Sequence, residues 1–296
     1  MGTIFILGAG FSKTCGIATD IEMLETLNPL LDRPPQPKDP GNLKTSIEYF
    51  LEQSFPGQTR VSFELFMSTL SASKFLPDCL ESDKNVFREE EQEIRAALRR
   101  YLKSCIDNVA WEKDGRAVMD FVRHVNWQHD FILTFNYDLL VEAAAKKLKL
   151  DVTGRIIHLH GAINERTLAW PTYTKFAYKT TKLPLARRWK TAFEVLRNQA
   201  KIDRLVFIGY SMPPSDLEAK SLFNYTDWYN HGPTSSALSP ITANNRYSYR
   251  VLVVNPSEAV KRNYGFFRKL PEFHLQTLEE WLKENEASPG PNDDLA

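Results

Sequence analysis

The feature that most constrains the fold lies near the middle of the chain, where two short apolar runs each end in polar residues. The first run begins at Phe131 and is followed by Asn136 and Asp138, and the second begins at Ile156 and is followed by His160. In open α/β sheets, ligands bind in a crevice at the carboxyl ends of the strands. We therefore expect Asn136, Asp138 and His160 to face one crevice and to carry the chemistry.

A glycine-containing turn follows another apolar run, which extends from Thr3 to Leu7. The turn spans Gly8 to Ser12, has the sequence GAGFS, and leads into a segment that can begin a helix. Backbone N–H groups in such a turn can approach a phosphate closely. The full dinucleotide fingerprint has a third glycine where this chain has Lys13, so a tight turn without a ligand is the alternative.

Two later apolar runs, Leu205 to Ile208 and Val251 to Val254, complete the expected sheet. Continuous apolar runs are typical of parallel strands that are covered on both faces. The sequence therefore predicts an α/β protein with a Rossmann-like parallel sheet, helices on both faces and a helical insertion subdomain. We expect Val251 to Val254 to be the last strand.

Apolar residues recur at helical spacing between the first and second expected strands. We expect one domain over residues 1–286, with a Rossmann core at about 1–25 and 126–275, a helical insertion at about 43–125, and a disordered tail at 287–296. Further helices are expected after a cap at Thr19 or Asp20, from Leu139 to Leu150, from a cap at Ser215 or Asp216 to Phe223, and from Leu278 to Glu284.

The composition narrows the functional classes. Lys and Arg together number 37, as do Asp and Glu, so the net charge indicates no class of partner. The three cysteines, Cys15, Cys79 and Cys105, are too scattered for a disulfide framework or a Cys-x-x-Cys zinc pair. The N-terminus lacks a signal-peptide pattern, and no apolar run approaches the roughly 20 residues of a transmembrane helix. We expect a soluble, cytoplasmic protein.

Several of these residues have structural alternatives. Asn136 can cap the following helix, and His160 can be a buried histidine whose ring is satisfied by the backbone. His158 and His160 lie two residues apart, which would place both side chains on one face of a strand and suggests a metal site. No third ligand of suitable spacing lies near in the sequence, so we assign His158 a structural role. The segment from Glu165 to Arg204 mixes basic and aromatic residues, which fits nucleic acid, an anionic ligand or a solvated surface.

Six motifs occur in the order seen in sirtuins, and together they span nearly the whole chain. The succession Asn-Tyr-Asp, His-Gly and Gly-Tyr-Ser-Met-Pro-Pro-Ser-Asp more closely resembles the SIR2-like domains of bacterial anti-phage defence proteins. The six motifs are Gly8 to Ser12, Gly16-Ile17, Thr134 to Asp138, His160-Gly161, Gly209 to Ser211, and Val254-Asn255.

The resemblance implies a domain that binds NAD in the crevice of its sheet. Asn136 and His160 match the catalytic pair of the family, and Asp138 matches a position that supports the nicotinamide-ribose end. Two groups would hold the rest of NAD: Gly8, Ala9, Gly10 and Ser12 along the pyrophosphate, and Ser211 and Asn255 near the adenosine ribose. The remaining residues expected to contact NAD are Phe11, Thr19, Asp20 and Gly209.

Two departures separate this chain from the deacylases of the family. Deacylases carry a four-cysteine zinc module between the His-Gly and Gly-x-Ser motifs, but residues 162–208 contain no cysteine. They also keep a Phe-Arg pair where this chain has the run Thr19 to Glu22. Both departures argue against deacylation, and no zinc is expected.

The leading hypothesis is an NAD+ glycohydrolase that releases nicotinamide and ADP-ribose, as an effector of anti-phage defence by NAD depletion. Nicotinamide leaves as a neutral pyridine without needing a proton, while an Asn can hold a water and a neutral His can act as base. The alternatives are a sirtuin-like deacylase or ADP-ribosyltransferase, and a non-catalytic nucleotide-binding subunit of a multiprotein complex. Expected partners are further copies of the chain and an ATPase, an Argonaute-like protein or a phage trigger, with nucleic acid involved only indirectly and no membrane.

Overall fold

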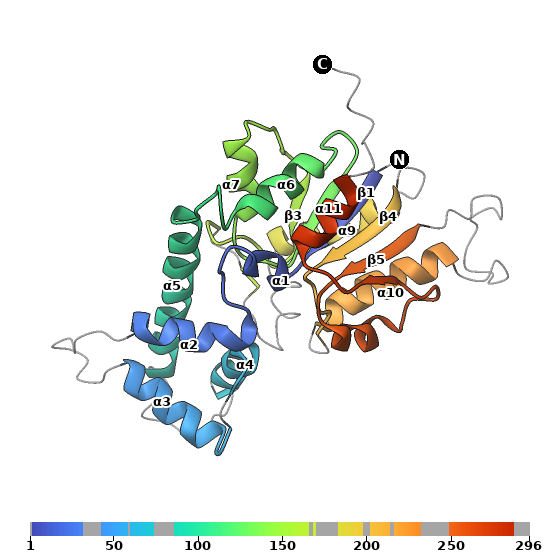
Figure 1. Cartoon of the computed structure of the whole chain (residues 1–296). Coiled ribbons are helices and arrows are strands. Elements are labelled where there is room, and N and C mark those ends of the chain that lie inside the picture. The colour runs from blue at the N-terminus through green and yellow to red at the C-terminus, as the bar shows by residue number, and fades with distance from the viewer. Residues whose placement is uncertain are drawn as a thin grey trace.

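The computed structural model describes residues 2–31, 43–58, 60–73, 86–165, 168–169, 183–197, 202–213, 216–231 and 249–286. It contains a six-stranded parallel sheet with the strand order β3-β2-β1-β4-β5-β6 (Figure 1). The order reverses between β1 and β4, as in doubly wound nucleotide-binding folds, so the predicted fold class is confirmed. The strands are β1 (Gly2–Leu7), β2 (Phe131–Thr134), β3 (Ile156–His158), β4 (Ile202–Ile208), β5 (Arg250–Val254) and β6 (Glu272–His274).

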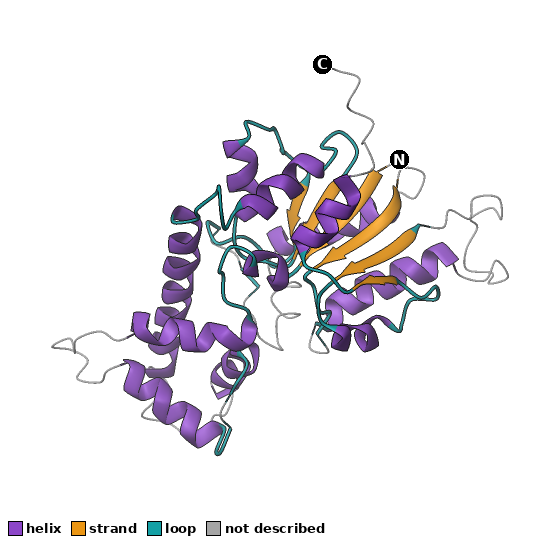
Figure 2. Ribbon diagram, in the orientation of Figure 1, coloured by secondary structure: helices purple, strands orange, loops and turns teal. Residues whose placement is uncertain are grey.

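Helices cover both faces of the sheet (Figure 2). Successive side chains of a strand point to opposite faces. Phe5 and Leu7 of β1 therefore pack in the cluster that includes residues of α6, α7 and α11, while Ile4 and Ile6 pack in the cluster that includes residues of α9 and α10. These helices are α6 (Arg116–His124), α7 (Leu140–Lys147), α9 (Leu183–Arg197), α10 (Leu217–His231) and α11 (Leu278–Glu286).

A separate group of helices stands beyond the carboxyl ends of the strands (Figure 1). In this helical group, α2 packs against α3, α4 and α5. Ile94, Leu98 and Leu102 of α5 recur every fourth residue and are buried, which gives the helix the apolar face that it needs. The next helix, α6, packs instead against α7 and α11. The helical group consists of α2 (Asp20–Leu31), α3 (Leu43–Ser54), α4 (Phe63–Ser73) and α5 (Val86–Asp107).

Glycines allow the loops after β1 and β4 to touch at the centre of the sheet. The N–H of Gly10 donates to the carbonyl oxygen of Gly209 at 2.9 Å. A β-carbon on Gly8 would lie 2.5 Å from the Cα of Tyr210, and one on Gly209 would lie 2.2 Å from the backbone nitrogen of Phe11. Gly209 also has a φ of +60°. Backbone packing alone therefore requires these glycines, whether or not a phosphate binds beside them.

The last strand differs from the prediction, because β6 follows β5 in both sequence and space. β6 contains Glu272, Phe273 and His274 and lies at the edge of the sheet. An edge strand needs no continuous apolar run, so the sequence gives little signal there. A 3₁₀ helix, η2 (Glu258–Tyr264), lies between β5 and β6 in the chain.

Two helix ends also differ from the prediction. α7 ends at Lys147 rather than at Leu150, because Lys149 takes a φ of 58° and the N–H of Leu150 returns to the carbonyl of Ala145 at 2.9 Å. α10 continues to His231, beyond the expected end at Phe223.

The helix starts and the C-terminal helix follow the sequence more closely. Thr19 directly precedes α2, as expected of a cap, but its hydroxyl donates to the carboxylate of Glu22 at 3.0 Å, and the same carboxylate accepts the N–H of Thr19 at 3.0 Å. The side chain of Glu22 therefore closes the start of the helix in place of the Thr19 hydroxyl. The helix expected from Leu278 is present as α11, and the tail at 287–296 lies outside the described residues. Among the helices that the structure describes, none is both long and apolar enough to cross a membrane.

The contact between the two glycine loops predicts a large difference between two alanine variants. Gly209→Ala should lower the free energy of unfolding by more than about 3 kcal/mol, because the methyl group meets backbone atoms that cannot move aside. Gly154 is a matched control, since its φ is +71° but nothing lies within 4 Å of the added carbon. Gly154→Ala should cost about 1–2 kcal/mol from backbone strain alone. Urea denaturation measures both, and equal losses would contradict the contact.

Candidate functional site

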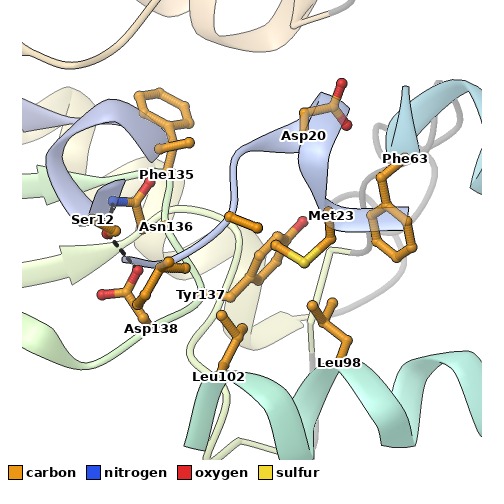
Figure 3. A pocket seen from close by; sticks show the side chains of 13 residues that line it. Ser12, Asp20, Met23, Phe63, Leu98, Leu102, Phe135, Asn136, Tyr137 and Asp138 are labelled. Atoms are coloured by element: carbon orange, nitrogen blue, oxygen red, sulfur yellow. Dashed lines mark hydrogen bonds between the residues drawn. The ribbon is translucent and has the colours of Figure 1, made fainter. Parts of the chain in front are cut away.

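A cavity of about 130 Å³ lies at the carboxyl ends of β1 and β2, against the helical group (Figure 3). Figure 3 shows Ser12, Asn136 and Asp138 on one side of it and Met23 and Phe63 on the other. Much of the polar lining therefore comes from the sheet edge, whereas Asp20 and much of the apolar lining come from the helical group. The complete lining is Ala9, Ser12, Ile17, Ala18, Asp20, Met23, Phe63, Leu98, Leu102, Phe135, Asn136, Tyr137 and Asp138.

A chain of hydrogen bonds fixes the polar side of the cavity. The amide nitrogen of Asn136 donates to the carbonyl oxygen of Gly8 at 2.9 Å and to the hydroxyl of Ser12 at 2.8 Å. The hydroxyl of Ser12 in turn donates to Oδ2 of Asp138 at 2.6 Å. Because the carbonyl of Gly8 can only accept, the amide of Asn136 has a single satisfactory orientation. The protein therefore uses both N–H bonds of this amide, and Oδ1 is left as its acceptor.

Asp138 is held as an acceptor at both oxygens. Besides the bond from Ser12, its Oδ1 accepts the N–H of Leu140 at 3.2 Å. Burial raises the pKa of the Asp138 carboxyl, while the hydrogen bonds from Ser12 and Leu140 act in the lowering direction. Asp138 is 7% exposed, so any ligand in the cavity meets its carboxyl group with little intervening water.

A histidine on the neighbouring strand contacts the backbone of Asn136. Nδ1 of His158 lies 3.2 Å from the carbonyl oxygen of Asn136, and Nε2 lies 2.6 Å from Oε1 of Glu142. Burial lowers the pKa of His158, but the hydrogen bond and charge of Glu142, with smaller contributions from the Asn136 carbonyl and Asp138, together outweigh it, so the net shift is upward. Glu142 was not predicted as part of the site, because no local motif marks its position in α7.

His160 occupies a different environment from Asn136. Its ring is buried, packs against Phe135 and Tyr137, and has Nε2 4.0 Å from Oδ2 of Asp216. The hydroxyl of Tyr210 donates to the same oxygen of Asp216 at 2.7 Å. Phe135 and Tyr137 line the cavity, whereas His160 is not among its lining residues. Asp216 was predicted only as a helix cap.

Three of the residues assigned to NAD near the cavity also have structural roles. Phe11 is 1% exposed and packs edge-on against Phe121 in the core. Thr19 is engaged with Glu22, and Asp20 accepts the backbone N–H of Glu64 at 2.8 Å. Asp20 and Ala9 do line the cavity, but Phe11 and Thr19 do not.

Ser211 and Asn255 follow the ends of β4 and β5 and do not line this cavity. The carbonyl oxygen of Ser211 accepts the amide N–H of Asn263 at 2.8 Å. Oδ1 of Asn255 accepts the N–H of Ser257 at 3.0 Å, which is an Asx-turn contact. Since the ends of parallel strands share one edge, these residues lie along the same edge of the sheet as the cavity.

Several features that line or surround the cavity could not be found from local sequence. Met23, Phe63, Leu98 and Leu102 look like ordinary core positions of amphipathic helices. His158 faces the carboxylate of Glu142, whereas His160 faces that of Asp216. The described part of the chain holds no cluster of three or more His, Cys, Asp and Glu residues that could bind a metal ion. Ser215 and much of the basic segment from Glu165 to Arg204 lie outside the described residues.

No protein-family model matches the chain, and no curated protein matches it. The chemistry that the site can perform must therefore be derived from its own residues. Its polar side presents acceptor oxygens of Asn136 and Asp138, and the remaining lining is largely apolar. Such a cavity suits a flat apolar group that carries hydrogen-bond donors or a positive charge.

The orientation of the Asn136 amide predicts that Asn136→Asp destabilises the protein despite its similar shape. The new carboxylate would turn an oxygen toward the carbonyl of Gly8 and would lie close to Asp138, at a cost of about 2–4 kcal/mol. Asn108 is a matched control, because its amide also donates to a carbonyl and to a serine hydroxyl, but on an exposed helix end. Asn108→Asp should cost less than about 1 kcal/mol. Urea denaturation at about pH 8 tests this, and equal losses would refute the assigned orientation.

Proposed function

We propose that this protein is an NAD+ glycohydrolase, which converts NAD+ and water into nicotinamide, ADP-ribose and a proton. The observation that carries the proposal is the hydrogen-bonded chain of Ser12, Asn136 and Asp138 in a cavity at the carboxyl edge of a doubly wound sheet. In such sheets, nucleotides bind at this edge, beside the point where the strand order reverses. Ser12 follows β1, which adjoins that point.

The character of the cavity supports binding of the nicotinamide end of NAD+. In NAD+ this end is a flat, positively charged ring that carries a carboxamide. Asp20 and Asp138 are the charged residues of the described lining, and both are acidic, so they favour a cation. Met23, Phe63 and Leu98 offer apolar contacts to the ring. The oxygens of Asp138 can accept an N–H of the carboxamide.

The proposed reaction breaks the bond between the pyridine nitrogen and C1 of the ribose. The electron pair leaves with the nitrogen, so nicotinamide departs neutral and needs no proton. The oxocarbenium-like ribose that remains is stabilised by the carboxylate of Asp138. Oδ1 of Asn136 accepts a hydrogen bond from the attacking water or from a ribose hydroxyl. The proposal assigns the proton that the water loses to His160, whose ring packs behind the lining residues Phe135 and Tyr137.

The rest of NAD+ would follow the edge of the sheet away from the cavity. Gly8, Gly10 and Gly209 lie where β1 and β4 end, and Ser211 and Asn255 follow β4 and β5. β2 and β5 are three strand spacings apart, which is about 14 Å and within the length of a dinucleotide. The proposal therefore keeps the pyrophosphate near the glycine loops and the adenosine near Ser211 and Asn255.

A second candidate is a subunit that binds NAD+ or another nucleotide without cleaving it. It is favoured by the position of His160, which is not among the residues that line the cavity. The biological setting, anti-phage defence by NAD+ depletion, rests on the resemblance of the motifs. In that setting, a requirement for assembly with further copies or with a partner protein would keep the activity off until it is needed.

Release of nicotinamide from NAD+ by purified protein tests the proposal. Asn136→Ala and His160→Ala should each release nicotinamide at least about 100-fold more slowly than wild type. Asn108→Ala and His129→Ala are matched controls at exposed positions and should keep the wild-type rate. The assay is run over a series of protein concentrations, because dependence on assembly would appear as a rate that rises more steeply than the concentration.

Two results would count against the proposal in different ways. Wild-type protein that binds NAD+ but releases no nicotinamide at any concentration would favour the non-catalytic subunit. Release that survives Asn136→Ala would show that another site cleaves NAD+.

A further inference from the structure

The ring of His158 joins three parts of the fold next to the candidate site. His158 ends β3, Asn136 lies in the connection from β2 to α7, and Glu142 lies in the first turn of α7. The ring is placed between the other two, with Nδ1 3.2 Å from the carbonyl oxygen of Asn136 and Nε2 2.6 Å from Oε1 of Glu142. His158 is 7% exposed, so water competes weakly for either contact.

Both neighbours of this ring are acceptors. A carbonyl oxygen can only accept a hydrogen bond, and so can an ionised carboxylate. A neutral imidazole has one N–H and can satisfy only one of the two, whereas an imidazolium donates from both nitrogens. With Glu142 ionised, the two contacts therefore require His158 in its doubly protonated form. The upward shift of the His158 pKa, to which Glu142 contributes most, agrees with this state.

Of the other charged groups around the ring, one favours the cation and the other is paired with a carboxylate of its own. Asp138, in the turn that carries Asn136, adds a second negative charge that stabilises protonated His158. On the side of α9, Arg188 donates to the carbonyl of His158 at 3.4 Å, and its guanidinium is paired with Glu165 at 2.6 Å. The register partner of His158 on β2 is the neutral Thr134.

We propose that the His158–Glu142 pair is a positioning device, in which protonated His158 holds the backbone of Asn136 in place and so makes the site pH-sensitive. When the pH rises through the raised pKa, His158 loses one proton. The remaining N–H stays with the carboxylate at 2.6 Å, and the lone pair of Nδ1 then faces the lone pairs of the Asn136 carbonyl. The stabilisation is therefore present at low pH and lost as the pH rises. The positioning rests on geometry, and its effect on catalysis rests on the proposed function.

Nitrogen-15 NMR of the labelled protein tests the positioning without any activity. The ring nitrogens of His158, assigned with His158→Gln, report its protonation between about pH 5 and pH 10. The backbone amide of Tyr137 shares a peptide group with the carbonyl of Asn136, so its signal reports the hydrogen bond to that carbonyl. In wild type, both ring nitrogens should be protonated at about pH 7, and the Tyr137 amide should shift with the same midpoint as His158.

Glu142→Gln removes the charge that holds the proton and should lower both midpoints by at least about one pH unit. Glu272→Gln is the matched control, because Glu272 contacts His274 in an exposed histidine–glutamate pair at 3.1 Å. Glu272→Gln should leave the His158 and Tyr137 titrations unchanged. The proposal would be overturned if His158 carried a single proton at about pH 7, or if the Tyr137 amide signal did not shift at the midpoint of the His158 titration.

The pH dependence of nicotinamide release tests the catalytic consequence. Wild-type kcat should fall at high pH with the midpoint of His158, and Glu142→Gln should move this fall to lower pH by the shift that NMR measures. A merely structural role for the pair would lower kcat at every pH and leave the midpoint in place. If wild type cleaves no NAD+, the proposed function fails, and the two NMR titrations alone decide for or against the positioning device.

Discussion

The contact between the glycine loops after β1 and β4 is the constraint on which the candidate site depends. Gly209 lies so close to the backbone of Gly10 and Phe11 that no side chain fits there. This contact fixes the path of the chain through Gly8, whose carbonyl accepts the amide of Asn136. The direction of every following hydrogen bond, from Asn136 to Ser12 and from Ser12 to Asp138, is set by that one acceptor. Tight backbone packing thus decides which atoms the site presents to a ligand.

The site combines two regions that are far apart in the sequence. The sheet edge supplies fixed acceptors, and the helical group supplies an apolar wall through Met23, Phe63, Leu98 and Leu102. Neither region alone makes a ligand site, because the acceptors would face water and the apolar wall would be an ordinary helix surface. The His158–Glu142 pair is the third component, and it acts through the backbone of Asn136 rather than on a ligand.

The sequence predicts best those features that depend on local pattern. The strands β1, β2, β4 and β5 follow from continuous apolar runs, and Asn136 and Asp138 reach the cavity because they directly follow β2. Features that depend on packing between distant segments could not be predicted. The edge strand β6 has no apolar run, and the pairing of Glu142 with His158 depends on how α7 lies beside β3. The position of His160 could not be predicted for the same reason, because its ring packs against Phe135 and Tyr137 and does not line the cavity itself.

The central claim is that the cavity at Ser12, Asn136 and Asp138 receives the nicotinamide end of NAD+. A crystal structure with carba-NAD+, in which a carbon replaces the ribose ring oxygen and prevents cleavage, measures this most directly. We expect the pyridinium ring between Asn136 and the side chains of Met23 and Phe63, with its carboxamide against Asp138. A dinucleotide bound elsewhere on the protein, with the cavity left without the ring, would contradict the claim.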